Sequence, residues 1–261
     1  MNLSLRGKTA VVCGSTQGIG RAIAVELAAA GANCILVARR QEALQSVVSE
    51  LDRSQGQQHE FRVVDFADGA AVESTAAEIA ARQKVEVLIN NTGGPSPGPV
   101  TDARAEQFTQ AFSQHVLNSQ ALVQAFLPGM KQAGYGRIIN IISTSVKIPI
   151  ANLGVSNTIR AAMAGWSKTL AQEVAASGIT VNNILPGYTR TGRLDSLIQA
   201  NAARQKTAVD ELTRRMENQI PARRFGEPEE IAALAAFLAA PAASYINGTN
   251  IPVDGGSTGA F

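Results

Sequence analysis

Two hydrophobic periods alternate along the chain. Short runs rich in valine and isoleucine are almost continuously apolar, which is typical of strands buried on both faces of a parallel sheet. These predicted strands are 9–13, 33–38, 61–64, 85–89, 137–142, 180–185 and 250–253. Between them a helical period predicts helices over 18–30, 41–54, 70–83, 104–132, 153–176 and 228–239. The repeated strand–helix order predicts an α/β protein with a doubly wound Rossmann fold, a seven-stranded parallel sheet flanked by helices.

One segment interrupts this alternation. Residues 189–225 are charged and contain glutamine-rich and alanine-rich pieces of helical character. A long excursion between the sixth strand and the last helix is where a lid over a substrate site would lie. No low-complexity linker or internal repeat divides the chain. We therefore predict a single domain over residues 1–261, with a helical substrate lid at about 189–225.

The loop after the first strand has the composition of a dinucleotide site. Gly14 permits a tight turn, Gly18 lets the backbone approach a pyrophosphate, and Gly20 lets helix and strand pack closely. The helix that follows presents free N–H groups and the positive end of its dipole to phosphates. At the first strand of a strand–helix repeat, this pattern indicates nucleotide binding more strongly than a structural turn. The predicted phosphate-binding residues are Gly14, Ser15, Thr16, Gln17, Gly18, Ile19 and Gly20.

Residues after the second and third strands indicate which dinucleotide binds. A carboxylate at the end of the second strand would favour NAD, but the chain has Arg39 and Arg40 there and no acid before Glu42. Arg39 can hold a 2′-phosphate through charge-assisted contacts, unless it starts the next helix and faces water. Asp65, followed by Phe66, is placed either to bond an adenine amino group or to cap a helix. We predict NADP as the cofactor, with NAD less favoured.

Composition and charge narrow the alternatives. The 261 residues are 45% hydrophobic and 17% charged, as in compact soluble proteins, and a net charge of +2 gives no support for nucleic-acid binding. No apolar run approaches the roughly 20 residues of a membrane span, and the N-terminus shows no targeting signal. We therefore predict a cytoplasmic protein without a membrane partner. Two histidines and two cysteines are too few and too scattered for a zinc site, so no metal is predicted.

Basic residues gather in the excursion over 189–225. They form either a solvated helical face or a basic rim that attracts an anionic small-molecule substrate. The excursion carries Arg190, Arg193, Arg204, Lys206, Arg214, Arg215, Arg223 and Arg224, against Asp195, Asp210, Glu211 and Glu217.

Four further motifs resemble those of the short-chain dehydrogenases/reductases, and with the glycine loop they cover nearly the whole chain. They are Asn90-Asn91-Thr92-Gly93, the strand that ends at Ser143, Pro186-Gly187-Tyr188-Thr189-Arg190-Thr191, and Val253-Asp254-Gly255-Gly256. Within the family the chain is most similar to the 3-oxoacyl-(acyl-carrier-protein) reductase branch. The resemblance implies an NADP(H)-dependent oxidoreductase that acts on a carbonyl group or secondary alcohol. It also implies that the cofactor contacts Asn91, Thr92, Gly93, Pro186, Gly187, Thr189 and Thr191.

The resemblance also shows which residues occupy the family's catalytic positions, and at these positions the chain departs from the family. Family members protonate the carbonyl with the tyrosine of a Tyr-x-x-x-Lys pair, while a serine orients the substrate and the lysine binds the nicotinamide ribose. Ser143 matches the serine, and Ser156 and Arg160 occupy the tyrosine and lysine positions. A serine hydroxyl is far less acidic than a phenol and reaches less far. Arg160 can bind ribose hydroxyls but cannot release a proton in a relay.

The family relay also includes a helix asparagine. Counting back along the predicted helix 104–132 without gaps puts His115 at that position, whereas a three-residue shift puts Asn118 there, one turn on. His115 and Tyr188 are the candidates for a replacement proton donor. The plainer alternatives are a histidine packed in the interior and a tyrosine packed on the cofactor ring.

Two functions fit these residues. One is an NADP-dependent oxidoreductase with an atypical proton relay, acting on a substrate such as a 3-oxoacyl thioester. The other is a dinucleotide-binding protein with little hydride transfer and a sensor or assembly role. The glycine loop and Ser143 favour the enzyme, because a pure binder needs no substrate-orienting serine. The resemblance further implies a homodimer or homotetramer that packs through the predicted helices 104–132 and 153–176.

Overall fold

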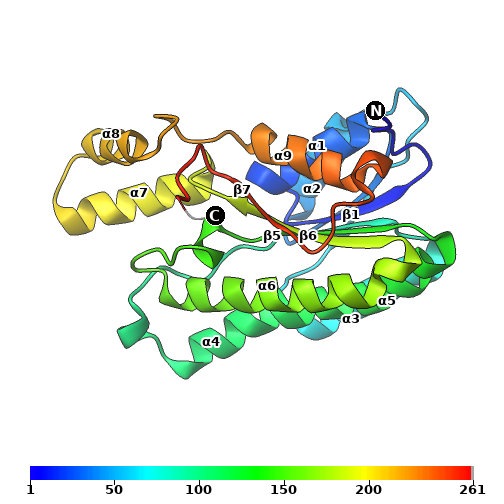
Figure 1. Cartoon of the computed structure of the whole chain (residues 1–261), viewed down its shortest axis with the longest axis horizontal. Helices are drawn as coiled ribbons and strands as arrows, with labels where there is room; N and C mark the ends of the chain where they lie inside the picture. The colour runs from blue at the N-terminus through cyan, green and yellow to red at the C-terminus, as the bar shows by residue number, and fades with distance from the viewer. Residues whose placement is uncertain (260–261) are drawn as a thin grey trace.

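Seven strands form one all-parallel sheet in the computed structural model, which describes residues 1–259. Their order across the sheet is β3-β2-β1-β4-β5-β6-β7 (Figure 1). The strands are β1 (Thr9–Cys13), β2 (Asn33–Ala38), β3 (Glu60–Val63), β4 (Val87–Asn90), β5 (Gly136–Ile141), β6 (Ile179–Pro186) and β7 (Asn250–Val253). This arrangement confirms the predicted doubly wound, seven-stranded parallel sheet.

Helices cover both faces of the sheet, and each face buries its own apolar cluster (Figure 1). Successive residues of a strand point to opposite faces, so Ala10 and Val12 enter one cluster while Val11 and Cys13 enter the other. The first cluster is covered by α1 (Gly18–Ala29), α2 (Gln41–Glu50) and α9 (Pro228–Ala239). The second is covered by α3 (Gly69–Arg82), α5 (Asn118–Ala133) and α6 (Gly154–Val174).

A row of asparagine side chains crosses the sheet within its interior. The Asn140 carbonyl oxygen accepts from the amide of Asn90 at 2.8 Å, and the Asn140 amide donates to Asn183 at 2.9 Å. Asn183 in turn donates to Asn250 at 2.7 Å. Asn140 and Asn183 each both donate and accept, so the bonds form a continuous chain that starts at Asn90 and ends at Asn250. This asparagine row therefore links β4, β5, β6 and β7 through side chains as well as through the backbone.

The predicted helix over 104–132 is confirmed in extent, since helical backbone runs from Ala105 to Ala133, but it is not a regular α-helix throughout. The segment forms α4 (Ala105–Phe112), a π-helical turn (Ser113–Leu117) and then α5, which contains Pro128. A π-turn holds about one residue more than an α-turn, so it rotates one half of the helix by about 100° relative to the other. Apolar spacing alone does not reveal a single inserted residue. The predicted helix 41–54 also ends early, at Glu50, because Leu51 has an extended backbone with φ −69° and ψ 140°.

The excursion over 189–225 contains two helices, α7 (Gly192–Gln205) and α8 (Val209–Gln219). They share a small apolar cluster of their own and project at one end of the molecule (Figure 1). No helix within residues 1–259 is long and apolar enough to cross a bilayer. The same residues contain no cluster of three or more histidine, cysteine or acidic side chains that could hold a metal ion.

Candidate active site

A cleft of about 840 Å³ runs along the carboxyl ends of the strands. It is lined by the loops that follow the first six strands and by the starts of α6 and α7. In a doubly wound sheet ligands bind at this edge, beside the point where the strand order reverses. Here that point lies between β1 and β4. The cleft therefore occupies the position expected for a ligand site.

The glycine loop after β1 depends on the absence of side chains. A Cβ added at Gly20 would lie 2.2 Å from the Gly14 carbonyl oxygen, and one added at Gly14 would lie 2.4 Å from the Asn91 carbonyl oxygen. Gly14 also has a φ of +61°, which disfavours other residues. The Asn91 amide donates to the carbonyl oxygens of Cys13 and Gly14, both at 3.2 Å. These contacts hold the loops after β1 and β4 against each other.

Two arginines line the cleft after β2. Arg40 donates to the side-chain oxygen of Gln17 at 3.1 Å, so it is tied to the glycine loop, while Arg39 is exposed at the rim. Asp65 and Phe66 line the cleft from the loop after β3. Asn118 does not line the cleft, because its amide donates to the Phe66 carbonyl oxygen at 2.7 Å. Asn118 thus supports the nucleotide end of the cleft from beneath.

Ser143, Ser156 and Arg160 line the cleft from β5 and α6. Ser156 and Arg160 are four residues apart on α6 and so lie on one helix face. The Ser143 hydroxyl oxygen accepts from the Ser145 amide at 3.1 Å, which leaves its proton free to donate. Arg160 donates to the Ile141 carbonyl oxygen at 2.9 Å. Burial, and to a lesser degree the charge of Arg193, lowers the pKa of Arg160 to about 10, so it remains a cation at neutral pH.

His115 lies behind the cleft wall, in the π-helical turn. Its Nδ1 atom is 2.6 Å from the Thr92 hydroxyl, and its side chain is only 3% exposed. Within the described residues its Nε2 atom has no hydrogen-bond partner. Burial, followed by the charges of Arg160 and Arg193, lowers the pKa of His115 to about 3. The histidine is therefore neutral at physiological pH and does not line the cleft.

Tyr188 lines a second, smaller hollow of about 230 Å³. Its ring stands edge-on to Phe225, with ring centres 6.1 Å apart, and burial raises the pKa of its phenol. Leu153 and Leu197 line both hollows, so the two hollows are neighbours, but Tyr188 lines only the smaller one. The structure consequently does not bring the Tyr188 side chain into the cleft with Ser143.

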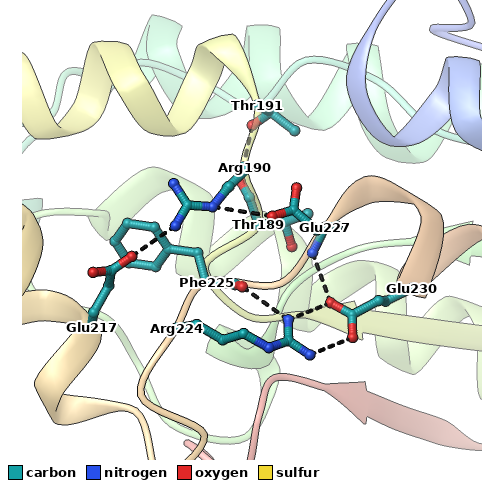
Figure 2. Close-up of polar contacts among 8 residues, drawn as sticks. All are labelled: Thr189, Arg190, Thr191, Glu217, Arg224, Phe225, Glu227 and Glu230. Atoms are coloured by element: carbon teal, nitrogen blue, oxygen red, sulfur yellow. Dashed lines mark hydrogen bonds and ion pairs between the residues drawn. The ribbon is translucent and has the colours of Figure 1, made fainter.

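Ion pairs fasten the base of the excursion over 189–225. Figure 2 shows Arg190 paired with Glu217 at 2.9 Å and with Glu227 at 3.1 Å, and Arg224 bound to Glu230 through two 2.7 Å contacts. Backbone hydrogen bonds also join residues 188–190 to residue 226. Exposed ion pairs are individually weak, but these connect the start of the excursion with its end. The two ends of the excursion are therefore fastened together where α7 and α8 leave the rest of the molecule.

Comparison with known proteins assigns the family. A family model described as enoyl-(acyl carrier protein) reductase matches residues 14–258. The chain is 34% identical over 257 residues to the NADPH-dependent reductase BacG of Bacillus subtilis, covering 96% of this chain and 97% of that protein. It is also 34% identical over 256 residues to the 3-oxoacyl-[acyl-carrier-protein] reductase FabG of Haemophilus influenzae, covering 97% and 98%.

The chain belongs to the short-chain dehydrogenase/reductase family. A solved structure, L-sorbose reductase from Gluconobacter frateurii complexed with NADPH and L-sorbose, matches it with a TM-score of 0.93 at 30% identity over 100% of both chains. The predicted family resemblance is thereby confirmed.

This short-chain dehydrogenase/reductase brings most of the predicted site residues to one cleft. Ser143, Ser156 and Arg160 line it, whereas His115, Asn118 and Tyr188 do not. Ser15 is fully buried and does not line it. The predicted cofactor residues that line it are Gly14, Thr16, Gln17, Gly18, Ile19, Gly20, Arg39, Arg40, Asp65, Phe66, Asn91, Thr92, Gly93, Arg160, Pro186, Gly187, Thr189 and Thr191.

Two polar side chains in the cleft were missed as site residues by sequence reasoning, those of Gln114 and Arg193. Arg193, in the first turn of α7, donates to the carbonyl oxygens of Gly94 at 2.9 Å and Pro95 at 3.1 Å. In the sequence it stood out only as one of the basic residues of the excursion. Its position two residues after Thr191, at the end of a family motif, was the available signal.

Proposed function

We propose that the chain is an NADP(H)-dependent oxidoreductase that interconverts a carbonyl group and a secondary alcohol through an atypical proton relay. The observation that carries this proposal is the single cleft shared by the glycine loop and the Ser143 hydroxyl. A cofactor and a substrate bound there would meet. The names of an NADPH-dependent relative and of a relative solved with NADPH support the choice of cofactor.

The residues present fit NADP. A pyrophosphate would lie on the backbone of the glycine loop and the first turn of α1, where side chains are excluded. Exposed Arg39 would hold the 2′-phosphate, while Arg40 is already tied to Gln17. The cleft carries one carboxylate, Asp65, which follows β3 and not β2. No acid in the described lining therefore opposes a 2′-phosphate at the end of β2.

The side chains of the reaction end would orient and polarise the substrate. When bound, the cofactor supplies the hydride. Ser143 would donate a hydrogen bond to the substrate oxygen, because a carbonyl oxygen can only accept and the Ser145 amide engages the Ser143 oxygen and not its proton. The fixed positive charge of Arg160 would favour an anionic substrate in the cleft. Neither Ser156 nor neutral His115 is an efficient acid near pH 7, so we infer that the proton comes from solvent.

A second function is favoured by one observation. The tyrosine position holds Ser156, and neither His115 nor Tyr188 lines the cleft. A dinucleotide-binding protein with little hydride transfer would show this combination, and it would bind NADPH without consuming it.

Cofactor titration followed by a turnover assay tests both proposals. We expect NADPH to bind more tightly than NADH, and NADPH absorbance to fall with at least one member of a panel of oxoacyl thioesters, ketones and sugars. Tight binding with no turnover on any substrate would favour the non-catalytic protein. A failure to bind either dinucleotide would overturn both functions.

We also propose a homo-oligomer that packs through α5 and α6. Trp166 is half-buried on α6, where its indole N–H donates to the Gln120 side chain at 2.8 Å, and exposed Leu117 lies just before α5. Sedimentation is expected to give a dimer or tetramer, and a monomer at micromolar concentration would contradict the proposal.

A further inference from the structure

Two guanidinium groups converge beside Gly94 in the cleft. A Cβ added at Gly94 would lie 2.7 Å from Nη2 of Arg193 and 3.3 Å from Nη2 of Arg160. Both nitrogen atoms therefore lie within 3.3 Å of one point next to the loop that follows β4. They come from different elements, because Arg160 lies on α6 and Arg193 on α7. We name Arg160 and Arg193 the arginine pair.

No acidic side chain neutralises the arginine pair. Among residues 1–259, neither guanidinium forms an ion pair within 4.0 Å, although seven such pairs occur elsewhere. Arg160 is only 8% exposed, and a buried cation without a counter-ion is costly. The like charge of Arg193 at close range adds a smaller cost, because Arg193 is exposed to solvent. An anion bound between the two guanidinium groups would reduce both the cost of the buried cation and the repulsion between the two cations.

Most donors of the arginine pair remain available. Each guanidinium carries five N–H groups. Arg160 uses one on the Ile141 carbonyl oxygen, and Arg193 uses two on the carbonyl oxygens of Gly94 and Pro95. The bonds of Arg193 also hold α7 across the cleft, so the pair is positioned before a ligand arrives. A planar carboxylate matches the fork of N–H groups that a guanidinium presents.

The strand order separates the arginine pair from the phosphate-binding end. Arg39 and the glycine loop follow β2 and β1, whereas Gly94, Ser143 and Thr191 follow β4, β5 and β6. Carboxyl ends of parallel strands line one edge of a sheet, so these groups follow one another along the cleft. The pair therefore lies on the Ser143 side of the cleft, away from Arg39 and the glycine loop.

We propose that the arginine pair binds a carboxylate of the substrate, so that the substrate that NADPH reduces is an oxo acid. The proposal rests on the function proposed above and names its substrate class. Arg160 and Arg193 line the same cleft as Ser143 and Ser156, so one oxo acid bound there can contact guanidinium and hydroxyl groups together. The carbonyl carbon gains a hydride from NADPH and its oxygen gains a proton from solvent. The products are a hydroxy acid and NADP⁺, and the carboxylate is unchanged.

The binding test uses two probes of equal size, oxamate and its neutral amide, oxamide. Calorimetric titration of the NADP⁺-loaded protein is expected to show oxamate binding at least about tenfold more tightly, as charge-assisted hydrogen bonds to a guanidinium predict. Arg193→Met is expected to weaken oxamate binding by about 10- to 100-fold without changing oxamide binding. Arg215→Met is the matched control, because Arg215 pairs only with Glu211 on the exposed face of α8, and it is expected to change neither.

Arg160→Met provides a second variant if loss of Arg193 disturbs the loop at Gly94. NADPH fluorescence titration of Arg193→Met is expected to give the wild-type affinity. Wild-type protein that binds oxamate no better than oxamide overturns the proposal without need of any variant. Equal weakening of both probes by Arg193→Met also overturns it, because Arg193 is then only a clamp on the loop.

A turnover comparison separates this proposal from the proposed function. We expect kcat/KM for 2-oxobutanoate to exceed that for its methyl ester, and Arg193→Met to abolish the difference. Equal turnover of both compounds would overturn the oxo-acid proposal and leave the oxidoreductase intact. Oxamate binding without oxidation of NADPH by any carbonyl compound would overturn the oxidoreductase and leave the carboxylate site.

Discussion

The nucleotide end of the cleft, after β1 and β2, contrasts with the reaction end, after β4, β5 and β6. At the nucleotide end the constraint is on the backbone, because a single Cβ at Gly14 or Gly20 would collide with a carbonyl oxygen within 2.5 Å. At the reaction end the family positions carry Ser156 and Arg160, and the helix that presents them is still in place. Dinucleotide binding thus depends on the path of the chain. The reaction depends on side chains, which can be replaced while the backbone that presents them keeps the same conformation.

Restoring the family residues gives the strongest test of this contrast. The double variant Ser156→Tyr/Arg160→Lys is expected to raise turnover of a simple ketone by about 10²- to 10⁴-fold, the usual share of general acid catalysis. NADPH affinity is expected to change little, because the glycine loop and Arg39 are untouched. Ser156→Tyr alone is expected to do less, since Arg160 would crowd the phenol and cannot relay a proton. NADPH absorbance and fluorescence provide the measurements.

A double variant that folds and binds NADPH, yet reduces no ketone, would show that the two ends of the cleft are not independent. The proposed function would then need a donor specific to this chain, and the preference for oxo acids would be the remaining guide to it.

At the nucleotide end, Arg39→Asp is expected to reverse the cofactor preference. Loss of a charge-assisted contact to the 2′-phosphate should weaken NADPH binding by about 10- to 150-fold, while the new carboxylate favours the ribose of NADH. Fluorescence titration with both cofactors measures the effect. Arg214→Asp makes the same charge change on exposed α8 and should leave both affinities as they are. Equal affinities for NADPH and NADH in the unmodified protein would contradict the role of Arg39.

His115 makes the reaction end sensitive to acid. Its folded-state pKa of about 3 lies below the ordinary value of 6.5, so the unfolded chain takes up a proton that the folded protein does not. The stability associated with neutral His115 is complete above pH 6.5 and is lost as the pH falls towards 3. Between pH 7 and pH 5 the loss should reach about 2 kcal/mol, measured as the change in urea midpoint.

His115→Asn is expected to remove most of that slope. A smaller slope should remain from His59, whose pKa is also lowered, mainly by burial. An unchanged slope in the variant would mean that His115 is accessible to protons in the folded protein.

The smallest effect is expected at the base of the excursion, where Arg190 and Arg224 pair with Glu227 and Glu230 at the start of α9 (Figure 2). Hydrogen bonds from Arg224 and from the Glu227 amide lower the pKa of Glu230 to about 2, from 4.5. The ionised carboxylate therefore stabilises the fold above pH 4.5, and this contribution is lost as the pH falls towards 2. Glu230→Gln should lower the melting temperature slightly at pH 7 and not at all near pH 2. A difference that persists at pH 2 would point to packing instead of charge.

Sequence reasoning reached the sheet and the lining of the nucleotide end because both leave local signals. The strands repeat an apolar pattern, and the glycines of the loop after β1 have no other common explanation at that spacing. The reaction end was reached in part. Ser143, Ser156 and Arg160 were located by the spacing of the family motif along the sequence, which does not depend on contacts between distant parts of the chain.

The remaining features depend on side-chain direction and on distant contacts. Arg193 meets a loop 99 residues earlier in the chain, and no local pattern announces that contact. Tyr188 belongs to a family motif, yet its ring turns to Phe225. The π-helical turn at His115 inserts one residue without altering the apolar composition. Each of these is set by packing that a periodicity does not encode.

The asparagine row separates the part of the molecule that holds the strands together from the loops that carry the site residues. It ties β4 to β7 through amides that end before the loops begin, and Asn91, directly after Asn90, extends the same amide bonding to the glycine loop. The four members of the asparagine row do not line the cleft, so the spacing between the strand ends is held from outside the ligand site. Substitutions in the loops can therefore change the reaction while the distances among the loops stay the same. A protein built in this way can lose one chemistry and acquire another without passing through an unfolded ancestor, and it offers protein engineers the same freedom.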